Sequence, residues 1–293
     1  MARGDVQLTN PALRFFKWSG GDGILSYYDK EKKENIEVPT PFTFLLLDTF
    51  TTIKGFNEKA GENIWANEIK DLKTQKLNVR SGKTTFELGF YADIKDSVVA
   101  KGGGYAQSCY ICYKENGELV IGNITMQGSS FSGGTHKPED KNMKDIEIGG
   151  WLSFAKTFKA EIYDKAVQIV GKDDRICTNG KVKFYAPVFK LIDTTPETNA
   201  KAIELTQKLK AYMKEYFVQT QAISEEDTNH AMENRVNEAH ANVHNTAPAT
   251  LTEQEKTFLV KEKPQDAPLQ EMGELPMETS FVEDSVDPDD LPF

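Results

Sequence analysis

Two cysteines in the chain have the spacing of zinc and redox sites, Cys109-Tyr110-Ile111-Cys112. A zinc site usually needs two more ligands. Only Cys177 and His136 could supply them, at an irregular spacing. On a β-strand, positions 109 and 112 point to opposite faces, which argues against chelation. We therefore interpret the cysteines as core residues and expect neither a metal ion nor a cofactor.

A second motif, Gly82-Lys83-Thr84, contains the end of a phosphate-binding loop. The full motif needs a glycine at position 77, which is Leu77, and a following helix, whereas the residues after Thr84 alternate as in a strand. No nucleophile, base and acid form a catalytic triad. Acidic pairs such as Asp173-Asp174 are typical of surface charge. The sequence predicts a protein without enzymatic activity, and a metal-dependent nuclease is the alternative.

Aromatic and basic residues alternate at several places, a pattern typical of single-strand binding, where rings stack on bases and cations hold phosphates. Phe16-Lys17-Trp18 is one such place, and 70–83 holds five basic residues and one acid. Many of the rings belong to the core, but Trp18 and Trp65 adjoin polar or charged neighbours. The candidate DNA-binding residues are Lys17, Trp18, Lys54, Phe56, Trp65, Lys70, Lys73, Lys76, Arg80, Lys83, Tyr105, Tyr110 and Lys183.

The elements that must position these residues are mostly strands. Period-two patterns predict strands within 12–18, 24–28, 42–56, 63–72, 83–91, 105–113, 118–124 and 181–192. Asn116-Gly117 predicts a tight hairpin. A helix is expected after Gly149-Gly150, and another from Thr195-Pro196, with Ile203, Leu209, Met213 and Phe217 on one side. The pattern predicts a mainly β fold, an antiparallel barrel with helical additions.

Charge is unevenly distributed along the chain. The 293 residues carry a net charge of −10, but 222–293 hold 17 acidic and four basic residues, a net of −13, which leaves +3 for 1–221. The first part also holds 27 of the 30 aromatic residues. A segment so poor in apolar residues cannot offset its ordering entropy. We predict a globular body over 1–221, a disordered acidic linker over 222–277 and an acidic tip over 278–293.

No stretch approaches 18 apolar residues, and the first residues lack the apolar run of a signal peptide. Three cysteines are too few for a disulfide framework. The sequence therefore predicts a soluble, cytoplasmic protein without a membrane partner.

The end of the chain is its sharpest feature. Residues 278–293 hold six acids and no base, and the chain closes with Asp289-Asp290-Leu291-Pro292-Phe293. A terminal Phe supplies an apolar anchor together with a free carboxylate, which suits an apolar pocket rimmed by Arg or Lys. We expect this tip to dock on partner proteins. Its candidate contact residues are Asp287, Asp289, Asp290, Leu291, Pro292 and Phe293.

This ending resembles the acidic, Pro-Phe-terminated tip of bacterial single-stranded DNA-binding proteins. The layout is similar to that of bacteriophage single-stranded DNA-binding proteins, which have a larger OB-fold body and an acidic, aromatic-ended tail. The close match covers only the last few residues. The body is similar only in general character, with β strands, aromatic residues and basic residues. The resemblance implies an OB-fold-like barrel that binds single-stranded DNA without sequence preference. It also implies that the tip recruits proteins of replication, recombination and repair, in the host cytoplasm if the protein is viral.

The opposite net charges of body and tail predict that the tail competes with DNA for the binding groove. A flexible coil of 72 residues spans roughly 45 Å, so the tip can reach the body. Two binding alternatives remain: a β-rich scaffold whose acidic tail recruits partners, and an OB-fold protein that prefers RNA. The sequence leaves open whether the protein forms a homo-oligomer or a cooperative filament.

Overall fold

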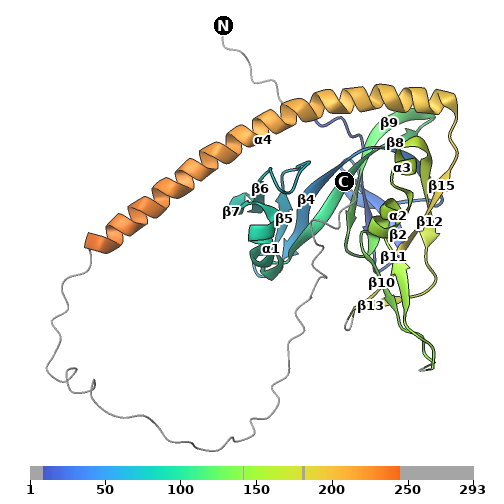
Figure 1. The fold of residues 1–293 in the computed structure, drawn as a ribbon, viewed down its shortest axis with the longest axis horizontal. Helices are drawn as coiled ribbons and strands as arrows, with labels where there is room; N and C mark the ends of the chain where they lie inside the picture. The colour runs from blue at the N-terminus through green and yellow to red at the C-terminus, as the bar shows by residue number, and fades with distance from the viewer. Residues whose placement is uncertain (1–8, 141, 180–181, 245–293) are drawn as a thin grey trace, which may run out of the picture. The chain divides into compact units, whose positions relative to one another are not determined.

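The computed structural model describes residues 9–140, 142–179 and 182–244, and the side chains of the last helix up to Thr220. An eleven-stranded sheet dominates the body (Figure 1), in the order β3-β2-β1-β9-β8-β4-β5-β6-β7, with β12 on β4 and β15 on β12. Its strands are β1 (Phe15–Ser19), β2 (Ile24–Asp29), β3 (Glu34–Val38), β4 (Phe42–Asn57), β5 (Glu62–Ala66), β6 (Leu77–Ser81), β7 (Thr84–Gly89), β8 (Gly103–Glu115), β9 (Glu118–Gln127), β12 (Ala166–Lys172) and β15 (Pro187–Ile192).

This large sheet is strongly curled. Phe16 on β1 and Phe42 on β4 are separated in the sheet by β9 and β8, yet their ring centroids are 5.1 Å apart. Three strand spacings in a flat sheet would put them about 14 Å apart. The concave side encloses the main core, to which eight strands contribute buried residues. Among its buried residues are Phe16, Leu25, Phe44, Ile111, Ile124 and Val167.

β4 is the central strand of the curl. It pairs with β8 from Phe44 to Gly55, with β12 over its first residues and with β5 over its last. A bulge between Leu46 and Asp48 changes which residues face the core. Before it, even-numbered residues such as Phe44 point inward. After it, odd-numbered residues such as Ile53 do.

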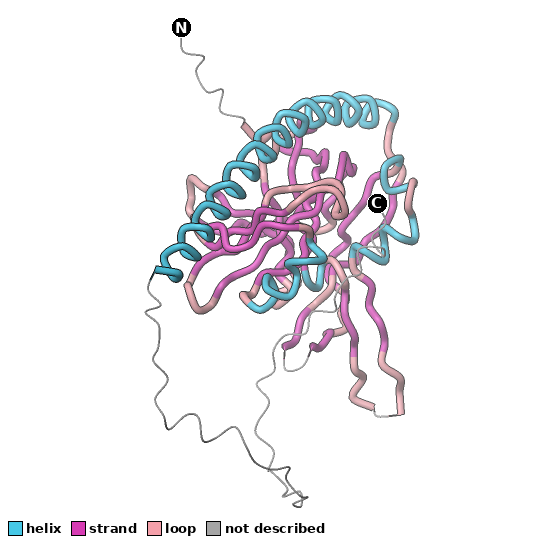
Figure 2. Tube along the Cα trace, turned by 60° about the vertical axis from the view of Figure 1, so that its left-hand side comes forward, coloured by secondary structure: helices cyan, strands magenta, loops and turns pink. Residues whose placement is uncertain are grey.

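A second sheet of four strands, in the order β11-β10-β13-β14, extends beyond the first (Figure 2). It is built from two hairpins, and all its pairings are antiparallel. A smaller apolar cluster of Ile148, Cys177 and Ala186, with Phe184 against it, fills its base. The strands are β10 (Gly133–His136), β11 (Ile146–Gly149), β13 (Cys177–Asn179) and β14 (Val182–Phe184).

Helices occupy the periphery of the sheets. One long helix, α4, packs on the outer side of the large sheet, where its buried Leu205, Leu209 and Met213 cover Leu45 and Leu47. The compact unit that contains the body ends within this helix, at Ser224. The described helices are α1 (Tyr91–Ala100), the 3-10 turn η1 (Gly128–Ser130), α2 (Trp151–Phe158), α3 (Glu161–Asp164) and α4 (Pro196–His244). None of them is long and apolar enough to cross a membrane.

The mainly β character and several local predictions are confirmed. Asn116 and Gly117 have φ angles of 50° and 91° and join β8 to β9, as a type I′ hairpin requires. Helix α2 begins directly after Gly149-Gly150, and α4 begins at Pro196. The Thr195 hydroxyl accepts a hydrogen bond from the Thr198 N–H at 3.3 Å, as an N-cap does. The described strands leave the large sheet open, because no ladder joins β2 or β3 to β12 or β15.

Other expectations need correction. Residues 91–100 form helix α1, although its apolar contacts, Tyr91, Ile94 and Val98, make too short a stripe for the sequence to indicate it. The single strand expected over 181–192 is instead two strands, β14 and β15, which belong to different sheets. Between them, the Tyr185 N–H donates to the Gly20 carbonyl, so Tyr185 pairs with neither sheet. β12 was not expected. Ile203, expected on the packed side of α4, is 61% exposed.

The segment expected to be a disordered linker begins as helix, because α4 runs through 222–244. The rest of that linker and the whole tip, including Asp287, Asp289, Asp290, Leu291, Pro292 and Phe293, lie outside the described residues.

Candidate nucleic-acid interface

The side of the large sheet that faces away from the main core, here called the outer face, carries the strongest candidate site. Pairing registers define it, because residues paired across antiparallel strands point to the same side. Lys54 on β4 pairs with Trp65 on β5, which pairs with Arg80 on β6. The three side chains therefore form one row across the outer face. The β4 bulge puts Lys54 and Phe56 there and not in the core.

Trp65, Phe56 and Arg80 make up one end of the face. Trp65 is 39% and Phe56 50% exposed. The Trp65 indole N–H donates to the Gly82 carbonyl at 3.2 Å, which fixes the ring, and the Arg80 guanidinium lies 5.5 Å from the ring centroid. Gly104 on β8 pairs with Lys54 and has no side chain, so it adds no bulk beside the row. An exposed ring next to a cation is what base stacking and phosphate contact need.

Phe15, Lys17 and Tyr28 make up a second end, on β1 and β2. Phe15 pairs with Asn123 and Lys17 with Thr125 on β9, in the parallel part of the sheet. Lys17 also pairs with Ser26, two residues before Tyr28, so Tyr28 points the same way. Phe15 is 51% and Tyr28 54% exposed, and Lys17 is exposed as well. This end again combines exposed rings with a cation. It lies three strands away from Phe56, because β9 and β8 separate β1 from β4.

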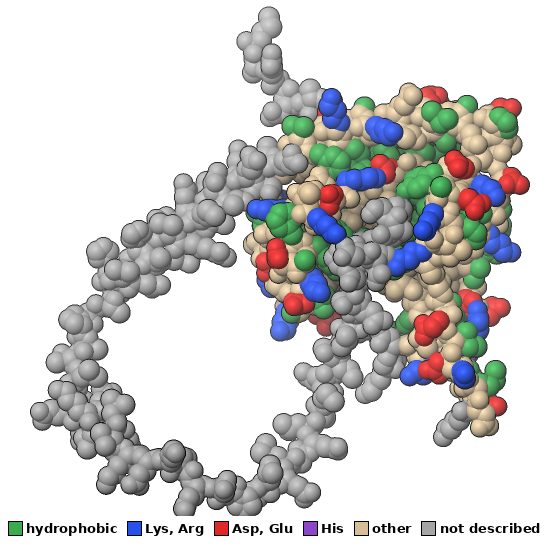
Figure 3. Space-filling view, in the orientation of Figure 1, with side chains coloured by type: hydrophobic (Ala, Val, Ile, Leu, Met, Phe, Trp, Pro, Cys, Tyr) green, Lys and Arg blue, Asp and Glu red, His purple; other side chains and the backbone are tan. Residues whose placement is uncertain are grey.

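The placement of exposed rings is the most specific feature of the molecule. Among the described residues, five aromatic side chains are exposed, and four of them lie on the outer face. The fifth is Tyr163 on α3. Exposed rings are costly to keep in water, and rings scattered by chance would not share one side of one sheet. In the view of Figure 3, basic side chains lie among hydrophobic ones over the upper and central body, with acidic ones interspersed.

Between the two ends lies a polar cluster centred on Glu68. Its carboxylate accepts hydrogen bonds from the Ser108 hydroxyl and, at 3.0 Å, from the Tyr110 hydroxyl. Asn123 donates to Ser108 at 2.6 Å. Burial raises the pKa of the Glu68 carboxyl, against the effect of its hydrogen bonds and of Lys54. Burial lowers the pKa of Lys54, and Glu68 acts in the opposite direction.

Helix α4 sets the limit of the open part of the outer face. Its Tyr216 hydroxyl accepts a hydrogen bond from the Glu68 N–H at 2.8 Å, and Phe217 packs on Phe50 with ring centroids 5.8 Å apart. On the other side of Tyr216 and Phe217, the outer face is covered by α4. We call the apolar residues that pack there the α4 cluster; they include Leu205, Leu209 and Met213 of the helix and Leu45, Leu47 and Cys112 of the sheet. The uncovered part of the outer face lies between the Phe15 end and the Trp65 end.

The structure brings together six of the thirteen sequence-predicted residues on the outer face. Lys76 directly precedes β6 and, by strand alternation, points to the same side as Asn78 and Arg80. Its ammonium lies 5.9 Å from the centroid of the Phe90 ring. The six are Lys17, Lys54, Phe56, Trp65, Lys76 and Arg80.

Three predicted aromatic contacts need correction. Tyr105 and Tyr110 are 7% and 0% exposed. Tyr105 faces the main core, where its hydroxyl pairs with Thr51, and Tyr110 is covered by α4. Trp18 points to the core side, and its indole N–H donates to the Tyr185 carbonyl at 2.9 Å. None of these rings offers the outer face a free surface, because strand alternation sends each toward packed side chains.

Four predicted cations lie apart from the row. Lys70 is held in an ion pair with Asp48 next to the Phe50 ring. Lys73 lies in the turn before β6, Lys83 in the turn after it, and Lys183 on β14 of the small sheet. Sequence reasoning missed Phe15, Tyr28 and Glu68, which also lie on the outer face. The two rings had a weak signal, because Phe15 alternates with the core residue Phe16 and Tyr28 with Tyr27.

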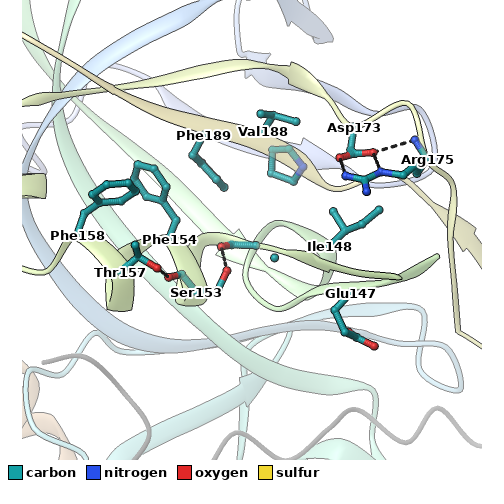
Figure 4. Close-up of a pocket in the computed structure, with 13 residues that line it drawn as sticks. Glu147, Ile148, Ser153, Phe154, Thr157, Phe158, Asp173, Arg175, Val188 and Phe189 are labelled. Atoms are coloured by element: carbon teal, nitrogen blue, oxygen red, sulfur yellow. Dashed lines mark hydrogen bonds and ion pairs between the residues drawn. The ribbon is translucent and has the colours of Figure 1, made fainter. Parts of the chain in front are cut away.

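A cavity of about 280 Å³ is a second candidate site (Figure 4). Phe154, Phe158 and Phe189 line one end, and the paired side chains of Asp173 and Arg175 the other. Arg175 donates twice to the Asp173 carboxylate, at 2.8 and 2.7 Å, so the two charges largely cancel. None of the predicted site residues lines this cavity. It has mixed polarity without a charge suited to phosphate.

The remaining motifs behave as structural elements. Cys109 faces the main core and Cys112 the α4 cluster, so the two thiols point to opposite sides, as expected. All three cysteines are buried and free, and burial raises their pKa values. In the part of the chain that the structure describes, no three His, Cys, Asp or Glu side chains are placed to hold a metal ion. Gly82-Lys83 forms the β6–β7 turn.

Comparisons of the chain with models of protein families, with curated proteins and with solved structures give no significant match. The functional interpretation therefore depends on the geometry of the outer face and on the sequence.

Proposed function

We propose that this protein binds single-stranded DNA, without strong sequence preference and without catalysing a reaction, through the outer face of its large sheet. The observation that carries the proposal is the gathering of exposed rings there: Phe15, Tyr28, Phe56 and Trp65. Bases would stack on these rings, and Lys17, Lys54, Lys76 and Arg80 would attract the phosphates. Because every base has a π-face, stacking on such rings tolerates any sequence.

The curled sheet supports an OB-fold-like interpretation of the body. β4, β8 and β9 are three adjacent antiparallel strands, and β1 adds to them in parallel. OB-fold barrels are partly open five-stranded barrels that bind oligonucleotides on the face of their second and third strands. If β4, β8 and β9 are the first three strands, the outer face of β8 and β9 corresponds to that surface. This correspondence is part of the proposal.

The acidic segment over 278–293 completes the proposed function. Coating a strand protects it, and a separate acidic segment lets the coated strand recruit proteins of replication, recombination and repair. An apolar-acidic peptide of this kind suits a basic, apolar pocket on a partner. A body that binds DNA and a tail that binds proteins would divide the two tasks between parts of one chain.

Fluorescence polarisation of labelled oligo-dT with the full chain, over a series of salt concentrations, tests the DNA-binding proposal. We expect binding that weakens as salt rises. Trp65→Ala should weaken it about tenfold, since stacking of one base on a ring is worth roughly 1–3 kcal/mol.

The control for this variant is Tyr163→Ala, which removes a ring of similar exposure, 41%, that lies off the outer face. It should leave the affinity unchanged, with thermal unfolding used to confirm that both variants are folded. Absence of binding by the wild-type chain at low salt would reject the proposed function and favour the scaffold alternative.

A further inference from the structure

A carboxylate lies in the middle of a surface that we propose to bind a polyanion. Glu68 follows β5, and an isolated bridge between Thr51 and Ile69 holds this segment alongside β4. Its side chain reaches across β4 to Ser108 and Tyr110 on β8. Glu68 is half-buried as a residue, while Ser108, Asn123 and Tyr110 beside its carboxylate are 3%, 2% and 0% exposed, so Glu68 is the member of the cluster nearest to solvent. A carboxylate at this place repels phosphate groups, so the sugar-phosphate chain is not what it favours.

The cluster around Glu68 is rich in acceptors. The carboxylate oxygens each accept one hydroxyl donor, and an ionised carboxylate has about four lone-pair sites, so acceptor capacity remains. The Ser108 hydroxyl hydrogen is directed at Glu68, and the Asn123 amide donates to Ser108. A ligand group that completes this cluster must therefore donate hydrogen bonds.

The two ring-bearing ends flank this cluster on either side. Phe15 and Lys17 lie on β1, one strand beyond Asn123 and Thr125, while Lys54 and Trp65 lie on β4 and β5. A base between the two ends that presents its edge to the sheet would meet this cluster. The cytosine N4 amino group donates, whereas thymine has the O4 carbonyl acceptor at that position. Thymine donates only through its N3–H, which lies between two carbonyl oxygens that a carboxylate repels.

We propose that Glu68 makes the outer face prefer bases with an exocyclic amino group, so that cytosine is bound more tightly than thymine. The inference rests on the proposed function, because it concerns the same surface. A carboxylate accepting from the cytosine N4 amino group is an established mode of base recognition. The preference is a modest bias added to stacking, which is itself independent of sequence.

The test compares the affinities of the full chain for labelled oligo-dC and oligo-dT of equal length, at pH 8 and one salt concentration. The tail affects both measurements equally, so the ratio isolates the base. We expect oligo-dC to bind at least about fivefold more tightly, the lower end of the discrimination of one good base contact. Equal affinities, or tighter binding of oligo-dT, would overturn the inference and leave the proposed function intact.

Glu68→Gln supplies the second arm, with Glu87→Gln as the matched control. Glu87 also accepts a hydrogen bond from a serine hydroxyl, that of Ser97, but pairs with the inward-facing Val79. The ratio should fall to near one in Glu68→Gln and persist in Glu87→Gln. A ratio that survives in a folded Glu68→Gln would show that Glu68 only ties β8 to α4. If wild type binds neither oligonucleotide, the proposed function itself fails.

Discussion

The side of the strand on which a residue lies decides whether its side chain is exposed on the outer face or buried. Tyr105 and Trp65 are both aromatic and both lie in strands, but one is 7% and the other 39% exposed. The hydrogen bonds of the two rings differ accordingly. The Tyr105 hydroxyl pairs with buried Thr51, and the Trp65 indole is fixed by the Gly82 carbonyl at the edge of its ring. Of the two rings, only that of Trp65 is exposed to solvent.

One prediction concerns Lys17, which is exposed on β1 and points to the outer face together with Phe15. Lys17→Gln should weaken oligo-dT binding and reduce the slope of log affinity against log salt by about 0.7, the value expected for one phosphate contact on a single strand. Lys144→Gln, an exposed lysine in the β10–β11 loop, is the control. A salt slope that is identical in Lys17→Gln and wild type would remove Lys17 from the interface.

The partly buried position of Glu68 predicts a pH dependence of stability. Burial raises the pKa of the Glu68 carboxyl in the folded state, and the hydrogen bonds from Ser108 and Tyr110 and the charge of Lys54 act in the opposite direction. The Tyr216 hydroxyl of α4 also faces Glu68 and accepts a hydrogen bond from the Glu68 N–H. A raised pKa means that the folded protein binds the proton more tightly, so the contribution of Glu68 to stability is lost as pH rises through that pKa. Glu68→Gln should therefore gain Tm relative to wild type as pH goes from 5 to 8.

Thermal unfolding of wild type, Glu68→Gln and Glu87→Gln at both pH values measures this effect. Glu87→Gln removes the same charge elsewhere and controls for net charge. If the Tm difference between wild type and Glu68→Gln were constant with pH, the Glu68 carboxyl would not titrate in this range.

At the scale of elements, α4 shows how a helix can both stabilise the body and limit its binding face. Its buried residues recur at Ala202, Leu205, Leu209 and Met213, a helical period that matches the apolar side chains of β4 and β8 beneath it. The hydroxyl of Tyr216 then bonds the backbone of Glu68. The position of the polar cluster thus depends on the packing of this helix.

Leu209→Ala should destabilise the protein by about 3 kcal/mol, because Leu209 is 1% exposed and truncation leaves a cavity under α4. Urea unfolding followed by circular dichroism measures the change. Ile203→Ala on the same helix removes a side chain that is 61% exposed and should have little effect. Equal destabilisation by both variants would mean that α4 does not pack on the sheet through the Leu209 side.

For the whole molecule, the division of charge between body and acidic segment predicts self-competition. The first 221 residues carry a net charge of +3 and the last 72 a net of −13. Because the acidic segment is tethered to the body, its local concentration near the basic surface is high. The segment therefore competes with other anions for that surface. Deleting 278–293 should therefore tighten oligo-dT binding at low salt and have little effect at high salt.

Polarisation titrations of the full and shortened chains in the same salt series measure this. Replacing the six acids of 278–293 with their amides, without deletion, separates charge from length. Unchanged affinity at low salt in both variants would exclude the competition.

Much of the local structure follows from the sequence alone. The Asn116-Gly117 turn, the starts of α2 and α4 and the division of charge are set by residues close together in the chain, and local conformational preference is enough to predict them. The opposite orientation of Cys109 and Cys112 follows in the same way from the period of a strand.

The tertiary structure decided which side of each strand became the core. Alternation predicts two faces but does not say which one is buried, and the bulge after Leu46 exchanges them, so that Lys54 and Phe56 point outward. The parallel pairing of β1 with β9 joins segments more than a hundred residues apart and brings Phe15 onto the face that carries Trp65. Such long-range pairings depend on the burial of the whole core, and no local pattern encodes them.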